Sequence, residues 1–571
     1  MIVRVVPDIP GLDKNFDYSV PPPLEPSVRP GAVVRVELNR RRVDAWVIDT
    51  GEHGAPGFDS VAADRLVDIL GVAELGVARD VVALAPWVAD RWAGPVRNVL
   101  ASATPSRKKA RVRNARRRGT EKDRRQYSGQ IEDLMSTGGA LLRVAPLASV
   151  LSVVETCAAR GTVLVLCPTL RMARLGAAWL RRQGLSTAEL PDETDAAIAG
   201  VDVVIGARSA VFADCDSLAS IVVIDEHEEA YFEERVPTWW APHVAVERAA
   251  RLAIPVFLTS PVPSAAAVSL MGQPVALGEP EWPRIDVVDL NEVPVRGSLL
   301  STDLIDCARA GDSPVLGILN TKGAGRVIVC KSCRALQACT ACGGSVESVG
   351  DELVCTRCAA SRSAVCGSCG RTSMVAARSG VSTLCRELSA ASGREITEVT
   401  ASTESVGNGS GVWIGTDALL HRVSSAGTVF FLDIDRDLSA PRMSAGREVL
   451  AAVARAARTV GRSGRVVIQT RQPSHPVVSA LVTGTIDQWL AEDTQLSRTL
   501  GLPPFTSVAQ CTFSGDVDEL EVASQDGVEW SLSGNVLSAR SADHDSLLAF
   551  VASLRSAHGQ AVRVSINPPR Q

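Results

Sequence analysis

Four closely spaced pairs of cysteines constrain the fold of this chain more than any other feature of its sequence. Eight of the 14 cysteines lie between residues 330 and 369, and they form Cys330-x2-Cys333, Cys339-x2-Cys342, Cys355-x2-Cys358 and Cys366-x2-Cys369. A structural Zn²⁺ takes four tetrahedral ligands, and a tight Cys-x2-Cys turn can point two thiolates at one ion. The four pairs therefore predict two Cys₄ sites and two zinc ions as cofactors.

Disulfide bonds and redox chemistry suit these cysteines less well than zinc does. Disulfides are typical of small secreted chains, whereas this chain has 571 residues and begins without a long apolar signal segment. A redox site needs one exposed Cys-x2-Cys pair rather than four. Residues 343–354 between the inner pairs are long enough for a hairpin that turns near Gly350. This length favours one ion shared by the inner pairs (zinc 2) and one shared by the outer pairs (zinc 1).

Length and composition indicate a folded protein of several domains. One hydrophobic core stops growing at roughly 250–300 residues, so a chain of 571 residues should contain several cores. Hydrophobic residues make up 46% of the chain and charged residues 22%, which is typical of globular proteins. No apolar run is long enough to cross a bilayer. We therefore expect a cytoplasmic protein without membrane contact.

Basic charge is concentrated in one segment. Between Ser106 and Gln126 eleven Lys or Arg residues stand against Glu121 and Asp123, a local charge of +9 in a chain whose net charge is −5. A segment with so few apolar residues cannot bury a core. We therefore expect residues 106–137 to form a basic linker.

Apolar patterns define a domain on each side of this linker. Residues 1–105 are predicted to form a β-rich domain that contains a hairpin with the tip Asn39-Arg40-Arg41. A helical pattern from Asp80 to Leu100 forms the last element of this domain. After the linker, short buried strands alternate with helical stretches, which predicts α/β domains with mainly parallel sheets. The predicted domains are residues 138–298, residues 299–472 with a zinc insert at 328–372, and a small α+β domain at 473–571.

An acidic strand end suggests a nucleotide site, but its phosphate loop is missing. The apolar run 221–224 leads into Asp225 and Glu226, an arrangement with which P-loop NTPases hold Mg²⁺ and activate water. A solvated strand edge has the same pattern. A working site also needs a G-x4-G-K-[ST] loop, whereas the strand-to-helix junction at 141–150 reads LLRVAPLASV. ATP is therefore a doubtful cofactor.

Further short segments occur in a fixed order along nearly the whole chain. They are FDYSVP (16–21), VVIGARSAVF (203–212), DEHE (225–228), SPVP (260–263), LNTKG (319–323), AAVARAAR (451–458) and LGLPPF (500–505). Together these segments resemble the motifs of the PriA family of primosomal replication-restart proteins, and in particular its actinobacterial members with degenerate helicase motifs. The winged-helix domain of that family has no visible counterpart here.

The resemblance implies two RecA-like helicase lobes with degenerate motifs, at 138–298 and 299–472. The Lys position of the phosphate loop falls on Ser149 and the hydroxyl position on Val150. The resemblance also implies the nested pairing of the cysteines and a domain at 1–105 that holds the 3′ end of a nascent DNA strand. Catalytic residues are then absent, and the remnants of the motifs are Asp225, Glu226, Arg455 and Arg458.

Aromatic residues supply the candidates for DNA binding. Tyr231, Phe232, Trp239 and Trp240 lie close together in sequence and could stack on single-stranded bases, or serve equally as core or interface anchors. Phe16 and Tyr18 flank Asp17, so a terminal base could stack there while the carboxylate accepts a hydrogen bond from a 3′ hydroxyl. Alternating core aromatics on a strand would give the same pattern. The residues predicted to bind DNA are Phe16, Asp17, Tyr18, Trp239 and Trp240.

The zinc insert contains no aromatic residue, so we do not expect it to stack on bases. The candidates for phosphate contacts in this insert are Lys331, Arg334, Arg357 and Arg362.

We therefore predict a non-catalytic, zinc-containing scaffold that binds forked and single-stranded DNA and helps to reload the replicative helicase. Its implied partners are single-stranded-DNA-binding protein and the replicative helicase or its loader, and its location is the nucleoid. The rival hypothesis is an active ATP-dependent 3′–5′ helicase with an unorthodox phosphate loop. Such an enzyme would lack the lysine ammonium that offsets the charge of the ATP phosphates, because Ser149 stands at the Lys position. A third hypothesis is a zinc-ribbon RNA-binding factor.

Overall fold

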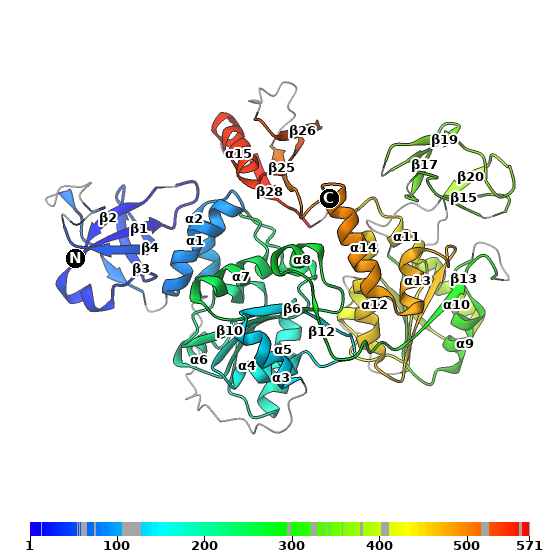
Figure 1. The fold of residues 1–571 in the computed structure, drawn as a ribbon, viewed down its shortest axis with the longest axis horizontal. Coiled ribbons are helices and arrows are strands. Elements are labelled where there is room, and N and C mark those ends of the chain that lie inside the picture. Colours follow the sequence, from blue (N-terminus) through cyan, green and yellow to red (C-terminus); the bar gives the residue numbers. More distant parts are fainter. Residues whose placement is uncertain are drawn as a thin grey trace. The chain divides into compact units, whose positions relative to one another are not determined.

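The computed structural model of the chain forms two compact units. It describes residues 1–12, 14–53, 55, 57–58, 65–73, 76–105, 127–293, 298–320, 328–333, 335–341, 343–356, 358–376, 381–400, 403, 410–514, 525–558 and 562–569. The first unit combines Met1–Arg143, Ser149–Leu277 and Ser497–Pro569, and the second combines Val144–Ala148 with Gly278–Leu496 (Figure 1). Among these residues, no helix has the length and apolar character needed to cross a bilayer.

The chain begins with a small β-barrel. Its sheet has the order β2-β1-β4-β3-β5. Ser19 of β2 exchanges backbone hydrogen bonds with Val67 and Ile69, each 3.0 Å long, while the adjoining β5 pairs with β3. The segment around Asp68 thus joins the two edges of the sheet. The elements are β1 (Ile2–Pro7), β2 (Phe16–Ser19), η1 (Pro22–Ser27), β3 (Val33–Leu38), β4 (Arg41–Gly51) and β5 (Gly71–Val72).

The predicted hairpin is confirmed, and the segment predicted to be helical is divided into two helices. Strands β3 and β4 turn at Asn39 and Arg40, both with positive φ. The helical pattern forms two helices, α1 (Arg79–Arg91) and α2 (Val96–Ala103). The chain breaks between them at Ala93, with φ 47°, and at Gly94, where a Cβ would come within 2.6 Å of Pro237. A close approach to a distant residue gives no local signal in a sequence.

A seven-stranded sheet follows, in the order β12-β6-β11-β10-β7-β9-β8. Strands β6 to β11 pair in parallel, as their apolar runs predict. The strands are β6 (Gly139–Val144), β7 (Thr162–Leu166), β8 (Thr187–Glu189), β9 (Val203–Gly206), β10 (Leu218–Val223), β11 (Val256–Ser260) and β12 (Val275–Leu277). The helices are α3 (Ser128–Ser136), α4 (Leu151–Ala158), α5 (Leu170–Arg182), α6 (Thr194–Ala199), η4 (Arg208–Phe212), η5 (Glu229–Tyr231), α7 (Ala241–Leu252) and α8 (Ala265–Met271).

The predicted linker 106–137 is too long at its C-terminal end. Residues 106–126 lie outside the described residues, but α3 belongs to the seven-stranded domain. Ile131 of α3 is fully buried, and the Gln130 side chain donates to the carbonyl of Ala276. A helix with one buried residue has too weak an apolar period to be detected in the sequence.

The C-terminal part of the first unit is an antiparallel sheet in the order β26-β27-β25-β28, covered by one helix. Its elements are β25 (Ser507–Phe513), β26 (Val528–Ser533), β27 (Val536–Ser541), α15 (His544–His558) and β28 (Val562–Ile566). Side chains of this sheet, of α1 and α2, and of the seven-stranded sheet form one hydrophobic core. These parts of the first unit are therefore packed against one another, whereas the interior of the β-barrel forms a separate core.

The second unit has a six-stranded sheet in the order β13-β24-β23-β14-β22-β21, with every pair parallel. The strands are β13 (Arg284–Asp289), β14 (Val315–Ile318), β21 (Ile396–Val399), β22 (Val412–Gly415), β23 (Thr428–Phe431) and β24 (Arg465–Thr470). The helices are α9 (Thr302–Ala310), α10 (Val381–Ser392), η6 (Asp417–His421), α11 (Ile434–Leu438), α12 (Ala445–Val460), α13 (Pro476–Thr483) and α14 (Ile486–Thr499).

Both predicted boundaries of this domain, 298/299 and 472/473, are wrong. Strand β13 pairs with β24, which lies far along the chain, so the unit begins before residue 284. Helix α14 packs on α12, where the Arg447 guanidinium donates to Asp493 at 2.6 Å, so the unit extends beyond residue 473. Long-range pairing of this kind cannot be read from local patterns.

Two small antiparallel sheets form the insert between β14 and α10. Their orders are β16-β15-β20 and β17-β18-β19. Strands β17 and β18 turn around Gly350, which confirms the hairpin predicted there. The strands are β15 (Ile328–Cys330), β16 (Leu336–Gln337), β17 (Val346–Val349), β18 (Glu352–Cys355), β19 (Ser361–Ser363) and β20 (Met374–Ala376).

Candidate functional site

The outer cysteine pairs converge on one point. The sulfurs of Cys330, Cys333, Cys366 and Cys369 all lie within 4.8 Å of one another. Cys330 Sγ is 3.6 Å from Cys369 Sγ, and Cys333 Sγ is 3.5 Å from Cys366 Sγ. A tetrahedral Zn–S₄ site with bonds of about 2.3 Å has sulfurs about 3.8 Å apart. The four side chains, called here the outer cluster, thus have the spacing of a closed metal site.

The inner pairs converge in the same way. Cys339, Cys355 and Cys358 lie with their sulfurs within 4.8 Å of one another, and the Cys339 and Cys358 sulfurs are 3.6 Å apart. The fourth predicted ligand, Cys342, lies outside the described residues. These side chains, called here the inner cluster, confirm that the cysteines associate in the nested order, outer pairs with outer and inner with inner.

Local backbone turns direct the thiols toward these points. In three of the pairs the residue after the second cysteine has a positive φ: Gly343 at 69°, Ala359 at 57° and Gly370 at 70°. The N–H of each donates to the carbonyl of the first cysteine of its pair. Burial disfavours the Cys366 thiolate, but hydrogen bonds from the Ser368 and Cys369 N–H groups and from the Cys333 and Cys369 thiols together lower the pKa of Cys366 to about 6. A thiolate is the form that binds a metal.

The turn between β6 and α4 lacks the features of a phosphate cradle. Such a cradle needs glycines that let the backbone approach phosphate and N–H groups that point at it. The turn contains no glycine, Pro146 has no N–H, and the N–H of Ala148 donates to Ala145 within the turn at 3.0 Å. Ser149 and Val150 lead directly into the helix.

Glu226 is bound to the protein itself. It is fully buried, and its two carboxylate oxygens accept hydrogen bonds from the N–H and the hydroxyl of Ser264, at 2.8 and 2.7 Å. Ser264 in turn accepts the Ala267 N–H at the start of α8. Asp225 is also buried and adopts a left-handed backbone conformation with φ 54°. The acidic strand end thus anchors a helix.

The other predicted remnants, Arg455 and Arg458, lie on α12 of the second unit. Both are partly buried. The Arg455 carbonyl accepts the Thr459 hydroxyl at 3.1 Å within the same helix. The four remnants are thus divided between the two units, two carboxylates in the first and two guanidiniums in the second.

Asp17 forms an ion pair on the β-barrel. The guanidinium of Arg4 on β1 donates to both of its carboxylate oxygens, at 2.8 and 2.9 Å. The two residues are cross-strand neighbours. The Arg4 guanidinium also lies over the Phe58 ring, 4.9 Å from its centre, and donates to the Gly57 carbonyl. The pair is partly accessible, with Asp17 7% exposed and Arg4 27%.

The aromatic neighbours of Asp17 face the barrel core. Tyr18 is 4% exposed, and its hydroxyl donates to the Glu37 carbonyl at 3.0 Å. Burial, followed by the nearby Glu37 charge, raises the pKa of Tyr18. Phe16 is partly buried against the same core. The prediction of base stacking by Tyr18 is therefore wrong in this structure, since no face of its ring is open, whereas Phe16 remains partly exposed.

The predicted stacking platform around Trp239 and Trp240 is also wrong. Their exposed fractions are 1% and 6%, because both rings belong to the shared core of the first unit. The neighbouring Thr238 hydroxyl accepts the Ile566 N–H from β28 at 3.3 Å. This segment therefore anchors the C-terminal sheet, as the alternative interpretation predicted.

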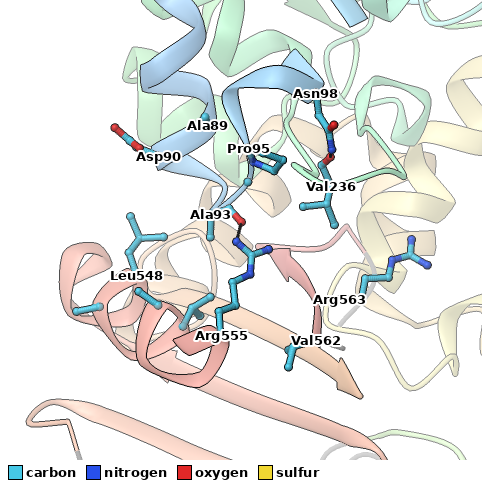
Figure 2. Close-up of a pocket in the computed structure, with 14 residues that line it drawn as sticks. Ala89, Asp90, Ala93, Pro95, Asn98, Val236, Leu548, Arg555, Val562 and Arg563 are labelled. Atoms are coloured by element: carbon cyan, nitrogen blue, oxygen red, sulfur yellow. Dashed lines mark hydrogen bonds between the residues drawn. The ribbon is translucent and has the colours of Figure 1, made fainter. Parts of the chain in front are cut away.

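A cavity of about 900 Å³ lies beside this anchor (Figure 2). The α1–α2 elbow, Val236 and the C-terminal domain line it. Figure 2 shows the Arg555 guanidinium donating to the Ala93 carbonyl, and the Asn98 amide donating to the Val236 carbonyl at 2.7 Å. These contacts tie the elbow to the C-terminal domain.

Sequence reasoning misses Arg4 and Ser264 as partners of the candidate carboxylates. Arg4 alternates with apolar residues on its strand, which marks it as polar and outward-facing. Its pairing with Asp17 depends on the register of two strands, which no sequence signal defines. Ser264 precedes an alanine-rich run, a signal from which a helix cap could have been recognised.

Comparison with known proteins gives one family-model match and several relatives. Residues 4–105 match the model of the 3′DNA-binding domain (3′BD) of PriA. The replication restart protein PriA of Bacillus subtilis is 30% identical over 28% of this chain and 22% of its own length. The probable replication restart protein PriA of Mycobacterium bovis is 27% identical over 60% of this chain and 59% of its own length.

These matches confirm the resemblance to the PriA family. PriA of Treponema pallidum is 26% identical over 54% of this chain and 52% of its own length. The chain therefore spans less than two thirds of the length of each of these relatives. Among solved structures, the Escherichia coli DEAH/RHA helicase HrpB aligns with 60% of this chain and with 42% of its own length. The TM-score is 0.33 and the sequence identity is 9%, and these values are too low to support a comparison of structure or function.

The two clusters predict a metal content that can be measured. Elemental analysis of metal-replete protein should give two zinc ions per chain, and Cys339→Ser should remove one of them, because the outer cluster does not use that thiol. Cys307→Ser, a cysteine outside both clusters, is the control and should keep two. Fewer than about 1.5 ions in the wild type would contradict the two-site arrangement.

Proposed function

We propose that this chain is a replication-restart protein that binds DNA forks through its N-terminal barrel and does not unwind DNA itself. The observation that carries the proposal is the match of residues 4–105 to a 3′DNA-binding domain. Forked and single-stranded DNA are its proposed ligands. Single-stranded-DNA-binding protein and the replicative helicase or its loader are its proposed partners, and the nucleoid is its proposed place in the cell.

The two parallel sheets serve in this proposal as RecA-like helicase lobes whose nucleotide chemistry has been lost. Support comes from the turn at 145–150, which offers neither glycines nor a lysine to a phosphate. The carboxylate of Glu226, which would act on water in a working enzyme, instead binds Ser264. Phosphoryl transfer depends on preorganised positive charge around the phosphates, and that charge is missing from this turn.

The two cysteine clusters hold zinc in this proposal. All the described ligands are sulfurs, which suits Zn²⁺, and a set of four thiols leaves no open position for chemistry. The ions would contribute to folding of the insert and take no part in a reaction. Cys330, Cys333, Cys366 and Cys369 would hold one ion, and Cys339, Cys342, Cys355 and Cys358 the other.

The barrel would recognise a 3′ end at the Arg4–Asp17 pair. A carboxylate oxygen has two lone pairs, so an oxygen that accepts from Arg4 can also accept from a terminal hydroxyl. The partly exposed Phe16 would lie against the terminal base. Because Arg4 neutralises Asp17, repulsion of a terminal phosphate is weaker than a lone carboxylate would produce, and the hydrogen bond becomes the main source of selectivity.

ATP hydrolysis tests the scaffold hypothesis against the active helicase. Purified protein should hydrolyse no ATP above background with or without forked DNA, and Glu226→Gln should change nothing in the same assay. Unfolding curves of the variant should be recorded in parallel, because Gln cannot accept both hydrogen bonds of Ser264. DNA-stimulated hydrolysis that Glu226→Gln abolishes would establish the rival helicase.

Substitution of Asp17 tests the 3′-end site. Wild-type protein should bind a fork with a 3′ hydroxyl more tightly than one with a 3′ phosphate. Losing a hydrogen bond to a charged group costs about 1.5–3 kcal/mol, roughly tenfold to a hundredfold in affinity. Asp17→Ala should weaken binding of the hydroxyl fork by this factor and release Arg4 to attract phosphate, so the preference should reverse in fluorescence anisotropy titrations.

Asp44→Ala is the matched control for this test. Asp44 pairs with Arg35 at 3.0 Å elsewhere on the same barrel, so its loss should leave the preference for the hydroxyl unchanged. An Asp17→Ala protein that keeps the wild-type preference would remove Asp17 from end recognition.

A further inference from the structure

The tip of the β3–β4 hairpin carries three consecutive arginines. Arg40, Arg41 and Arg42 are all exposed. In the part of the chain that the structure describes, none of them takes part in an ion pair, and the nearest ion pair along the hairpin is Arg35 with Asp44. These three guanidiniums are therefore available to a ligand of opposite charge.

The backbone of this tip is strained. Asn39 and Arg40 have φ values of 50° and 62°, the left-handed conformation that a two-residue hairpin turn requires at both positions. Asn tolerates this conformation, and Gly is the favoured second residue, whereas a long side chain with a Cβ is not. A residue that keeps an unfavourable conformation at an exposed tip suggests that its side chain has a function.

The tip and the proposed 3′-end site belong to the same barrel and are connected through Tyr18. The Tyr18 hydroxyl, one residue from Asp17, bonds to the Glu37 carbonyl, and Glu37 stands opposite Arg42 in the hairpin. Through β1, Asp17 is at the level of Asp49 on β4, which is eight residues from Arg41, or about 26 Å along a strand. Guanidinium groups at the tip can therefore reach phosphates several nucleotides back from a DNA end held at Asp17.

We propose that Arg40, Arg41 and Arg42 bind the phosphate backbone of the DNA duplex that leads to the 3′ end. Neighbouring residues of a strand point to opposite faces, so Arg41 and Arg42 extend on both sides of the tip while Arg40 extends at its end. This arrangement can follow a groove with phosphates on either side. The proposal rests on the proposed function, and it adds duplex binding to recognition of the terminal nucleotide.

Salt dependence of fork binding tests this proposal. The triple variant Arg40→Ala, Arg41→Ala, Arg42→Ala should bind a fork more weakly and lower the slope of log affinity against log salt by up to about 0.9 for each lost phosphate contact. Its binding to a trinucleotide with a 3′ hydroxyl, which fills only the terminal site, should be unchanged. The variant Arg40→Lys, Arg41→Lys, Arg42→Lys keeps the positive charge, so it should keep most of the slope of log affinity against log salt.

Arg40→Gly separates binding from folding. Glycine fits the positive φ, so the variant should unfold at a higher denaturant concentration while binding the fork less tightly. Wild-type affinity and slope in the triple Ala variant would overturn the proposal. Failure of the wild type to prefer any 3′ end would instead overturn the proposed function, so the two failures are distinguishable.

In the zinc insert, a buried side chain connects the two cysteine clusters. Gln337 on β16 is 4% exposed. Its Nε2 donates to Cys366 Sγ of the outer cluster at 3.5 Å, and its Oε1 accepts from Arg362 Nη2 at 3.1 Å. Arg362 lies on β19, in the sheet that carries the inner cluster, and also donates to the Val365 carbonyl at 2.9 Å. It is therefore occupied within the insert and does not fit the predicted phosphate contact.

We infer that Arg362 and Gln337 couple the two metal sites. An N–H donor to a thiolate disperses its charge and fixes its orientation, and loss of such an outer partner typically lowers metal affinity by about 10- to 100-fold. Inner-cluster ligands stand at the end of β18 and just before β19. Metal bound there would hold β19 in place, and thereby Arg362 and Gln337. The outer site should then bind metal more tightly when the inner site is filled, and the reverse also holds.

Zinc release to a coloured chelator measures this coupling. Gln337→Leu keeps the size of the side chain but cannot donate, so it should release the outer ion about 10- to 100-fold more readily. Cys339→Ser, which disables the inner site, should weaken the outer site similarly. The double variant should be no weaker than either single one, because both break the same connection. Additive effects, or unchanged release from Gln337→Leu, would overturn the coupling.

Discussion

The first unit depends on a shared hydrophobic core to which three separate stretches of chain contribute. Leu84 of α1, Trp239 after β10 and Phe550 of α15 are all buried in it. Fully burying one large apolar side chain contributes about 1.5–3 kcal/mol to the free energy of unfolding. This is a substantial share of the net stability of a domain. The β-barrel, the seven-stranded sheet and the C-terminal sheet are therefore linked energetically. A change in one of them affects the stability of the others.

The same kind of packing gives the acidic strand end a structural role. Glu226 accepts from the N–H and the hydroxyl of the partly buried Ser264, and removing Glu226 would leave both donors without this acceptor. Nearby, Ser260 bonds to His227 at 2.7 Å and accepts the Val262 N–H. These contacts stabilise the turn that precedes α8. The acidic strand end thus has a structural role that does not depend on a bound phosphate.

Local features of the fold can be predicted from the sequence, whereas long-range ones cannot. The buried strands, the hairpin at Asn39 and the nested cysteine clusters follow from apolar runs and spacing. The burial of Trp239 escapes prediction because composition cannot distinguish an exposed aromatic cluster from one covered by residues 300 positions away. The pairing of β13 with β24 and of Arg4 with Asp17 depends on register, which only the folded sheet defines. Arg362 resembles a phosphate ligand in the sequence because its partner Gln337 belongs to another strand.

The discontinuity of the first unit has a consequence for synthesis on the ribosome. Its core needs Ser497–Pro569, yet the whole of Gly278–Leu496 is translated between that segment and Leu277. At about 5–20 residues per second this delay lasts roughly 10–45 s. During this interval the core side chains of α1, α2 and the seven-stranded sheet lack their contacts with the C-terminal sheet. The second unit is by then fully synthesised. Nascent chains of this protein should therefore need protection by chaperones at their N-terminal part, and the C-terminal strands complete the fold last.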